Sequence, residues 1–227
     1  MYSYICLMNS LTEENYLKAI YSLSADRGTV NVNDLSKRLD IRMPTVTSMM
    51  KKLAERKLVR YEKYKPVSLT PKGEKAAMYV VRKHRLTEMF LVEIMGFGWE
   101  EVHDIAEQIE HVKSAEFFRK MDELLGHPSF DPHGSPIPDP EGNIRRDPLP
   151  ALSECREGEK VSLSAVSDSS SEFLTFLNSR RLSLGTEINI LSIEPFDGSM
   201  MLSYDGTSGQ VFSKVVCDKL LVGRKEK

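Results

Sequence analysis

Apolar residues recur at helical spacing along the first part of the chain, after polar residues typical of helix starts. Ser10 and Glu13 have the spacing of a capping box, and the apolar positions behind them predict a helix over residues 11–24. A second stripe predicts a helix over about 32–39. A third is predicted around Pro44, through about residue 57, because proline suits a first helical turn. Two short helices joined by a tight turn predict a helix-turn-helix.

The next segment is strand-like over residues 58–65, turns at Pro66 and returns over 67–69. A β-hairpin directly after a candidate recognition helix predicts the wing of a winged helix. Three further helices are predicted. The first, over about 71–95, is capped by Thr70-Pro71 and ended by Gly96 and Gly98, and the other two, over about 99–112 and 114–125, close at Gly126.

Residues 127–150 contain seven of the eleven prolines, which is typical of a semi-rigid linker. Beyond them the chain becomes β-rich, with strands predicted over 160–166, 187–193 and 200–204 and a short helix near 170–179, which favours a small SH3-like β-barrel. The predicted fold class is therefore mainly α with small β parts. The expected domains are a winged helix-turn-helix over 1–76, a helical domain over 77–140, a linker over 141–154 and an SH3-like domain over 155–227.

The formal charge of −2 hides an uneven distribution. Residues 1–86 hold 17 Lys and Arg against 8 Asp and Glu, a balance of +9, whereas residues 87–227 hold 14 against 25, a balance of −11. A basic N-terminal third attached to an acidic remainder favours a nucleic-acid partner for that third.

Other features exclude whole classes of protein. No stretch approaches the ~18–20 apolar residues of a membrane span. Cys6, Cys155 and Cys217 lie too far apart for a disulfide framework or a Cys-x-x-Cys metal site, which fits a reducing cytoplasm. The first eight residues are too short for a signal peptide, and both Met1 and Met8 stay open as the first residue of the protein.

The face of the third helix opposite its apolar stripe carries short hydroxyl and basic side chains. Such residues suit an approach to base edges in the major groove, and basic residues of a wing suit phosphates. A solvated helix face is the alternative, but the basic wing and the +9 charge favour DNA. The predicted DNA-binding residues are Arg42, Pro44, Thr45, Thr47, Ser48, Lys51 and Lys52 in the helix, with Arg60, Lys63 and Lys65 in the wing.

Histidine and glutamate gather on two neighbouring predicted helices. His103, Glu107, Glu110 and His111 share one face of the later helix, and His84 and Glu88 share a face of the earlier one: this six-residue pattern predicts a shared metal site. Nitrogen and oxygen donors without thiolate suit Mn²⁺ or Fe²⁺, although Zn²⁺, Co²⁺ or Ni²⁺ could also bind. Ordinary ion pairs on exposed helices are the alternative. An enzyme is disfavoured because no His-Glu-x-x-His, phosphate loop or nucleophile motif occurs.

These motifs, taken together, resemble the diphtheria-toxin-repressor family of metal-activated transcription regulators, including its manganese-sensing branch. The stretches that carry the resemblance are residues 13–21, Pro44-Thr-Val-Thr47, Leu69-Thr-Pro-Lys-Gly73, residues 82–88, residues 102–111 and Pro132-His-Gly-Ser-Pro-Ile-Pro138. The resemblance implies that residues 1–76 form a winged helix-turn-helix DNA-binding domain, that 77–140 form a helical dimerisation and metal-binding domain, and that 155–227 form an SH3-like (FeoA-like) barrel.

The resemblance also implies two metal sites. The primary site would use Glu107, Glu110 and His111, with His84 and Asn15. The second site would use either His84, Glu88 and His103 with Glu172, or Glu88, Asp131 and His133 with Asp168, and both sets stay open. Glu107 stands where iron sensors carry cysteine, which favours Mn²⁺. At the position of Asn15 the family usually carries methionine or aspartate, so this residue departs from the family's pattern.

The resulting hypothesis is a Mn²⁺- or Fe²⁺-activated regulator that binds a palindromic double-stranded DNA operator as a homodimer, without an organic cofactor or a membrane. Repression of metal-uptake genes is the expected role. The alternatives are a metal-independent or zinc-structural winged-helix regulator and, from another class, a metalloenzyme. The barrel could also act as a protein-interaction module.

Overall fold

The computed structural model describes residues 10–144 and 148–224. Met1, Cys6 and Met8 lie outside these ranges, and so does the choice between Met1 and Met8 as the start. The chain forms two compact units. Within the described ranges, the first unit contains residues 10–87, 106–129 and 137–144, and the second contains 88–105, 130–136 and 148–224.

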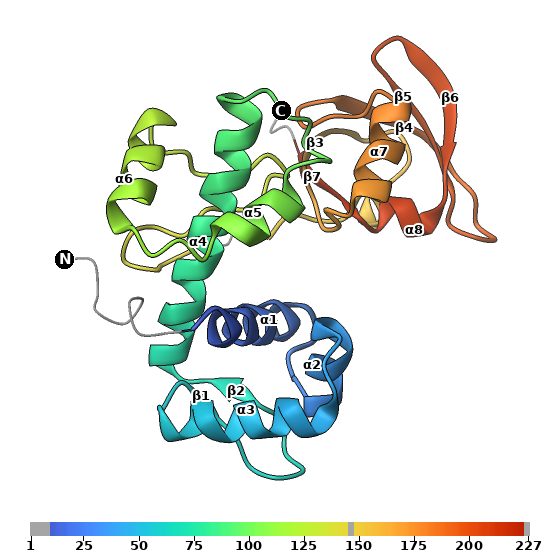
Figure 1. Cartoon of the computed structure of the whole chain (residues 1–227). Helices are drawn as coiled ribbons and strands as arrows, with labels where there is room; N and C mark the ends of the chain where they lie inside the picture. The colour runs from blue at the N-terminus through green and yellow to red at the C-terminus, as the bar shows by residue number, and fades with distance from the viewer. Residues whose placement is uncertain (1–9, 145–147, 225–227) are drawn as a thin grey trace. The chain divides into compact units, whose positions relative to one another are not determined.

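The helix-turn-helix predicted from the sequence is present. Its helices are α1 (Leu11–Arg27), α2 (Val32–Leu39) and α3 (Met43–Glu55), gathered around one core with the hairpin of β1 and β2 (Figure 1). Ser10 caps α1 through the predicted capping box, since both of its reciprocal hydrogen bonds with Glu13 are formed. The third helix ends just before Lys57, whose backbone adopts a positive φ of 59° that a helix cannot continue.

The wing is shorter than predicted. β1 (Val59–Arg60) pairs antiparallel with β2 (Ser68–Leu69), and the expected strand over 58–65 is wrong beyond Arg60. The reason is a turn in which Tyr64 adopts a φ of 68° and the Lys65 amide donates to the carbonyl of Glu62. The polar tip of the hairpin is therefore a loop.

The long helix α4 (Pro71–Glu93) confirms the prediction, with Thr70 accepting a hydrogen bond from the amide of Gly73. A Cβ at Gly73 would lie 1.8 Å from the carbonyl oxygen of Leu58, so only glycine allows the helix to start this close to the wing. Helix α5 (His103–Ile109) is shorter than predicted at both ends, because residues 99–102 form turns and a bend before it and residues 110–111 form a turn after it. Helix α6 (Ala115–Leu124) follows, capped by Ser114.

The proline-rich segment after α6 is not only a connection, because several of its residues are buried. Phe130 and Pro136 form an isolated β-bridge, and Asp131, His133 and Ile137 are buried. Within the second unit, a Cβ on Gly134 would come 2.6 Å from Cα of Ala165, so this loop lies directly against the following strand β3.

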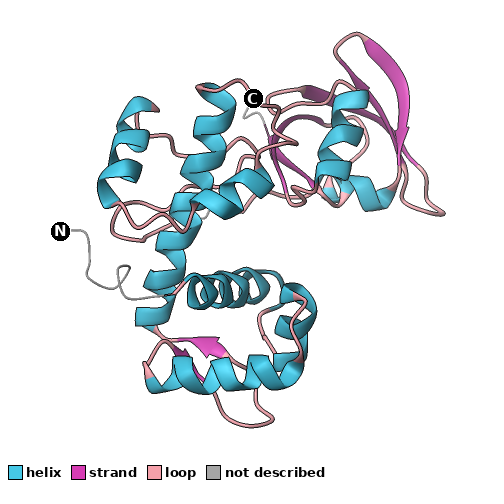
Figure 2. Ribbon diagram, in the orientation of Figure 1, coloured by secondary structure: helices cyan, strands magenta, loops and turns pink. Residues whose placement is uncertain are grey.

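Strands gather in the C-terminal part of the chain, as Figure 2 shows. The predicted strands β3 (Lys160–Val166), β4 (Glu187–Ile193) and β5 (Met200–Tyr204) and helix α7 (Ser171–Ser179) are confirmed. Four elements were not predicted: the 3-10 helix η2 (Leu152–Glu154), β6 (Thr207–Phe212), α8 (Lys214–Cys217) and β7 (Leu220–Arg224).

The five strands form one antiparallel sheet in the order β6-β5-β4-β3-β7. The edge strands β6 and β7 do not pair with each other within the described residues. The prediction of a closed barrel is therefore wrong, and the SH3-like sheet stays open. One apolar core, which includes Leu163, Leu174 and Phe212, joins the sheet to α7. None of the described helices is long and apolar enough to cross a lipid bilayer.

Candidate metal centre and nucleic-acid interface

Helix α3 separates an apolar face from a polar one. Val46, Met50 and Leu53 are fully buried in the core of the first unit, which turns the other side of the helix outward. The predicted DNA-binding residues of this helix lie on that outward side and are exposed, apart from the half-buried Thr47: Arg42, Pro44, Thr45, Ser48, Lys51 and Lys52. The structure therefore offers one polar, basic helix face to a partner.

Two of these side chains already have partners in the protein. The Ser48 hydroxyl donates to the carbonyl of Pro44 at 3.0 Å, which leaves its oxygen lone pairs as acceptors. Lys52 lies 3.3 Å from Glu13, which also accepts from Arg56 at 2.6 Å. Burial raises the pKa of Glu13, but the hydrogen bonds from Arg56, Ser10 and Lys52 outweigh it and hold that pKa below the ordinary value.

The wing presents its three predicted basic residues, Arg60, Lys63 and Lys65, at exposed positions. Between the lysines stands Tyr64, which is 92% exposed and which the sequence reasoning missed. The ammonium of Lys63 lies 4.8 Å from the centre of the Tyr64 ring, within the range of a cation–π contact. A large aromatic residue flanked by lysines in a hairpin turn is the signal that could have identified it.

We call six side chains of the first unit the first cluster: Asn15, Lys18, His84, Glu107, Glu110 and His111. Contacts join the last five, and Asn15, a predicted ligand, lies three residues before Lys18 on α1. Helix α1 supplies the first two, α4 supplies His84, and α5 with the turn behind it supplies the others. Glu110 lies at the centre and its side chain has no exposed surface. Its Oε2 is 2.6 Å from Nδ1 of His84, so segments distant in sequence converge on one carboxylate.

His111 is oriented by a residue that the sequence reasoning did not identify. Its Nδ1 lies 2.7 Å from Oε2 of Glu14, and because a carboxylate accepts, this nitrogen donates the proton. In the neutral ring Nε2 then keeps a lone pair, and it points to Oε1 of Glu110 at 3.5 Å. A histidine held by a carboxylate in this way is the usual arrangement of a metal ligand and its supporting residue.

Lys18 is a further residue that the sequence reasoning missed. Its ammonium lies 2.6 Å from Oε1 of Glu107 and 2.7 Å from Oε2 of Glu110, and the Lys18 side chain is only 16% exposed. A cationic group therefore lies between two carboxylates proposed as ligands.

The proposed ligands of the first cluster, which are all its members except Lys18, fit a divalent metal by their chemistry. Oδ1 of Asn15 and Oε1 of Glu110 are buried, and neither has a hydrogen-bond partner among the described residues. An unsatisfied buried polar atom costs ~1–3 kcal/mol, which a bound cation would recover. Imidazole nitrogens, carboxylates and an amide oxygen form a donor set that suits Mn²⁺ or Fe²⁺.

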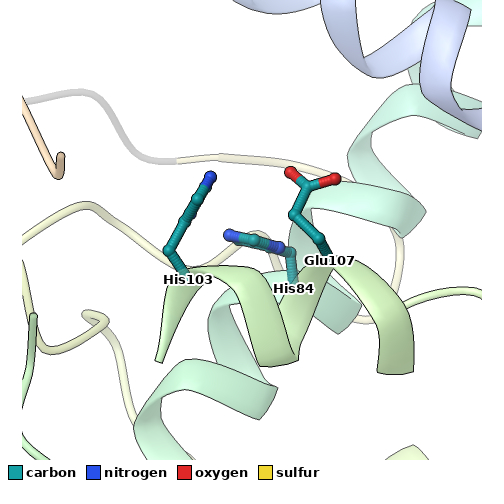
Figure 3. A group of neighbouring side chains, drawn as sticks. All are labelled: His84, His103 and Glu107. Atoms are coloured by element: carbon teal, nitrogen blue, oxygen red, sulfur yellow. The ribbon is translucent and has the colours of Figure 1, made fainter. Parts of the chain in front are cut away.

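Figure 3 shows two residues of this cluster, His84 on α4 and Glu107 on α5. These two residues offer ligand atoms within 4.8 Å of each other. His103 stands one turn before Glu107 on the same face of α5.

Glu88, Asp131 and His133 form the second cluster, which lies wholly in the second unit. All three are buried and offer ligand atoms within 4.8 Å of one another. Oδ1 of Asp131 accepts from the amides of His133 and Ser135 at 2.9 Å each, which fixes the loop that carries both ligands. His103 approaches the same Glu88 with its Nδ1, 3.3 Å from Oε1.

The imidazole of His133 is also held in a defined tautomer. Its Nε2 lies 2.8 Å from the carbonyl oxygen of Trp99, and because a carbonyl only accepts, Nε2 carries the proton. Nδ1 of the neutral ring is left with a lone pair on the side of Glu88, 3.8 Å from its Oε2.

Two predicted ligands lie apart from these groups. Asp168 and Glu172 belong to no group of three metal-ligating residues within 4.8 Å in the part of the chain that the structure describes. Asp168 pairs with Lys219; although burial raises the pKa of Asp168, hydrogen bonds from Lys219 and Ser170 hold it below the ordinary value. Glu172 is exposed in the first turn of α7.

Comparison with known proteins matches three parts of the chain to known families. Residues 8–67 match the family "Iron dependent repressor, N-terminal DNA binding domain", residues 70–139 match "Iron dependent repressor, metal binding and dimerisation domain", and residues 151–222 match the FeoA domain. The diphtheria toxin repressor of Corynebacterium glutamicum is 31% identical over 209 residues, which are 87% of this chain and 90% of that protein.

The chain belongs to the diphtheria-toxin-repressor family.

Other members of this family are similar over different lengths. The iron-dependent repressor IdeR of Mycobacterium tuberculosis is 39% identical over 133 residues, and this match spans 58% of each chain. A solved structure named as a manganese-dependent transcriptional repressor in complex with manganese has a TM-score of 0.83 and 32% identity, covering 94% of this chain and all of that one. These relatives are named as regulators of transcription and not as enzymes.

Proposed function

We propose that this member of the diphtheria-toxin-repressor family is a Mn²⁺- or Fe²⁺-activated repressor that binds a palindromic DNA operator as a homodimer in the cytoplasm. One observation carries the proposal: helix α1 of the winged-helix core and the end of α5 contribute to the same buried, acidic cluster of metal-ligating residues. Genes for metal uptake are the natural targets, since repression by the imported metal closes a feedback loop.

The proposed metal ligands tie the DNA-reading helix to the helical core. Helix α1 packs against α2, which packs against α3, and residues of all three share one apolar core. Fixing Asn15 and Glu14 of α1 against Glu110 and His111 therefore also fixes α3. When bound, the metal supplies a divalent positive charge that holds these donors together.

Such a tie can activate DNA binding only under one condition. The ligands must meet in the DNA-competent arrangement better than in any other, because only a difference in affinity shifts a population. Two copies of α3 related by a two-fold axis then read two half-sites, which is why a palindrome is expected. Thr45, Ser48 and Lys51 are the proposed readers, with Arg60, Lys63 and Lys65 on phosphates.

We assign the second cluster a supporting metal site formed by Glu88, Asp131 and His133. Burial of all three side chains and the fixed tautomer of His133 support this set over the alternative with Glu172, which is exposed. We retain the domain division at residues 76, 140 and 154 as part of the proposal.

A DNA-binding assay tests the proposal. Duplexes are selected from a random pool by the protein with Mn²⁺, and binding is then measured with Mn²⁺, with Fe²⁺ under anaerobic conditions and with chelator. We expect binding to weaken by at least tenfold in chelator. Glu110→Gln should remove the metal response while circular dichroism shows a folded protein. DNA binding of equal strength with and without metal would instead favour a metal-independent or zinc-structural regulator.

A further inference from the structure

Lys18 lies among the proposed ligands of the first cluster, but no metal site needs a lysine ammonium. Its side chain is largely buried, and Nζ contacts Glu107 at 2.6 Å and Glu110 at 2.7 Å. The same ammonium lies 3.1 Å from Nδ1 of His84. Three of the proposed ligands thus surround one fixed positive charge.

The position of this charge has a direct electrostatic consequence. A metal ion bound to the oxygens of Glu107 and Glu110 would share both carboxylates with the ammonium and would lie a few ångströms from it. Two cations at that distance repel strongly where the side chains around them are mostly buried, as those of Lys18 and Glu110 are. The metal and the Lys18 ammonium therefore compete for the same two carboxylates.

The Lys18 ammonium also stabilises the metal-free form of the protein. Glu110 has no exposed side-chain surface, and an unpaired carboxylate buried this deeply is strongly unfavourable. Lys18 neutralises that charge and ties α1 to α5 when no metal is present. Lys18 thereby stabilises the state that the metal has to replace.

We propose that Lys18 is a built-in competitor that sets the metal affinity of the first cluster: the metal binds only when it displaces the ammonium from Glu107 and Glu110. This rests on the proposed function in one respect, that the first cluster binds metal. Its consequence is a raised threshold, so that the regulator responds only when the metal is abundant.

Calorimetric titration of the full chain with Mn²⁺ tests the proposal. The titrations use a His133→Gln background so that the second cluster does not contribute. Lys18→Met, which keeps the length of the side chain and removes its charge, should bind Mn²⁺ about tenfold more tightly. Lys18→Arg keeps a cation at the position and should bind no more tightly than the parent. Lys37→Met, a charge removed from an exposed site on α2, controls for net charge.

Thermal unfolding in chelator gives a second readout. Without the ammonium the buried Glu110 keeps, among the described residues, only its contacts with His84 and His111, so Lys18→Met should melt at a lower temperature than the parent, and Lys18→Arg should recover part of the loss. Saturating Mn²⁺ should reverse the order and raise the melting temperature of Lys18→Met by more than that of the parent.

The outcomes separate this inference from the proposed function. Equal or weaker Mn²⁺ binding by Lys18→Met, or no binding at the first cluster in any variant, overturns the role of Lys18. DNA binding that ignores metal, measured separately on the parent, overturns the proposed function and leaves the calorimetric comparison valid.

Discussion

The imidazole of His133 stacks on the indole of Trp99, with ring centres 6.0 Å apart and planes inclined by 24°. The contact joins a proposed ligand of the second cluster to the single tryptophan of the chain. Any change in the charge or position of His133 is therefore felt by the only indole fluorophore. Tryptophan emission becomes a local measure of metal binding at that cluster.

We predict that Mn²⁺ changes the emission of Trp99 in a saturable way. Asp131→Asn should abolish most of the change, because it removes one negative charge and keeps the oxygen that accepts from the loop amides. Fluorescence titration measures this. Glu107→Gln, in the first cluster, is the matched control and should leave the signal in place. A signal that survives Asp131→Asn and His133→Gln would show that the second cluster is not the site.

The carboxylate of Glu14 should matter for metal affinity although it is not a proposed ligand. It accepts the proton of His111 and so directs the other ring nitrogen toward Glu110. We predict that Glu14→Gln weakens Mn²⁺ binding at the first cluster by ~10-fold or more, the range typical of supporting residues. Calorimetric titration in the His133→Gln background measures the loss. Glu100→Gln removes an acidic residue far along the chain as the control.

The two clusters show where sequence reasoning succeeds and where it stops. Helical periodicity predicted that Glu107, Glu110 and His111 share one helix face, since a face is a local property of spacing. The structure brings them into one cluster, but it ends α5 at Ile109 and leaves Glu110 and His111 in the following turn. The roles of Glu14 and Lys18 depend on the packing of α1 against α5, whose residues are about ninety positions apart. No periodicity shows which of several glutamates or lysines such packing selects.

In the C-terminal sheet, some strands could be predicted from the sequence and others could not. Strands β3, β4 and β5 have the apolar alternation that a half-buried strand requires, and their bounds were predicted correctly. Strand β6 buries only Phe212 among its six residues, so its pattern is that of a loop. Whether a sheet closes depends on its curvature and edge pairing, which burial patterns do not encode.

The exposed ring of Tyr64 leads to a prediction for DNA binding. Its position at the tip of the basic wing, beneath the ammonium of Lys63, suits packing on the sugar-phosphate backbone. We predict that Tyr64→Asn weakens metal-dependent DNA binding ~5-fold, because asparagine tolerates the positive φ but removes the ring. Fluorescence anisotropy with a selected duplex measures the change. Tyr64→Phe keeps the ring and should bind within twofold of the parent, and equal losses in both variants would argue against ring packing.

The wing lysines should act through charge alone. Lys63→Gln is expected to weaken binding to all DNA sequences by a similar factor and to reduce the slope of log affinity against log salt by about one, the loss of one phosphate contact. Titrations at several salt concentrations, with a selected and an unrelated duplex, measure both quantities. A loss confined to the selected duplex would mean that Lys63 reads bases.

The buried carboxylate of Glu13 predicts a pH dependence of folding. Hydrogen bonds from Arg56, Ser10 and Lys52 outweigh the effect of burial and lower its pKa in the folded state. A lowered folded-state pKa gives stability that is fully present above the unfolded value of 4.5 and is lost as the pH falls through the folded value. Compared with Glu13→Gln, the parent should therefore be more stable by ~2 kcal/mol at pH 7, a size typical of hydrogen bonds to charged groups, and the difference should shrink steadily below about pH 4.5.

Urea unfolding between pH 3 and pH 7 measures the stability of the parent and of Glu13→Gln. Glu55→Gln, an exposed position on α3, should track the parent throughout, and a Glu13→Gln difference that does not change with pH would mean that the side chain acts by packing rather than by its charge.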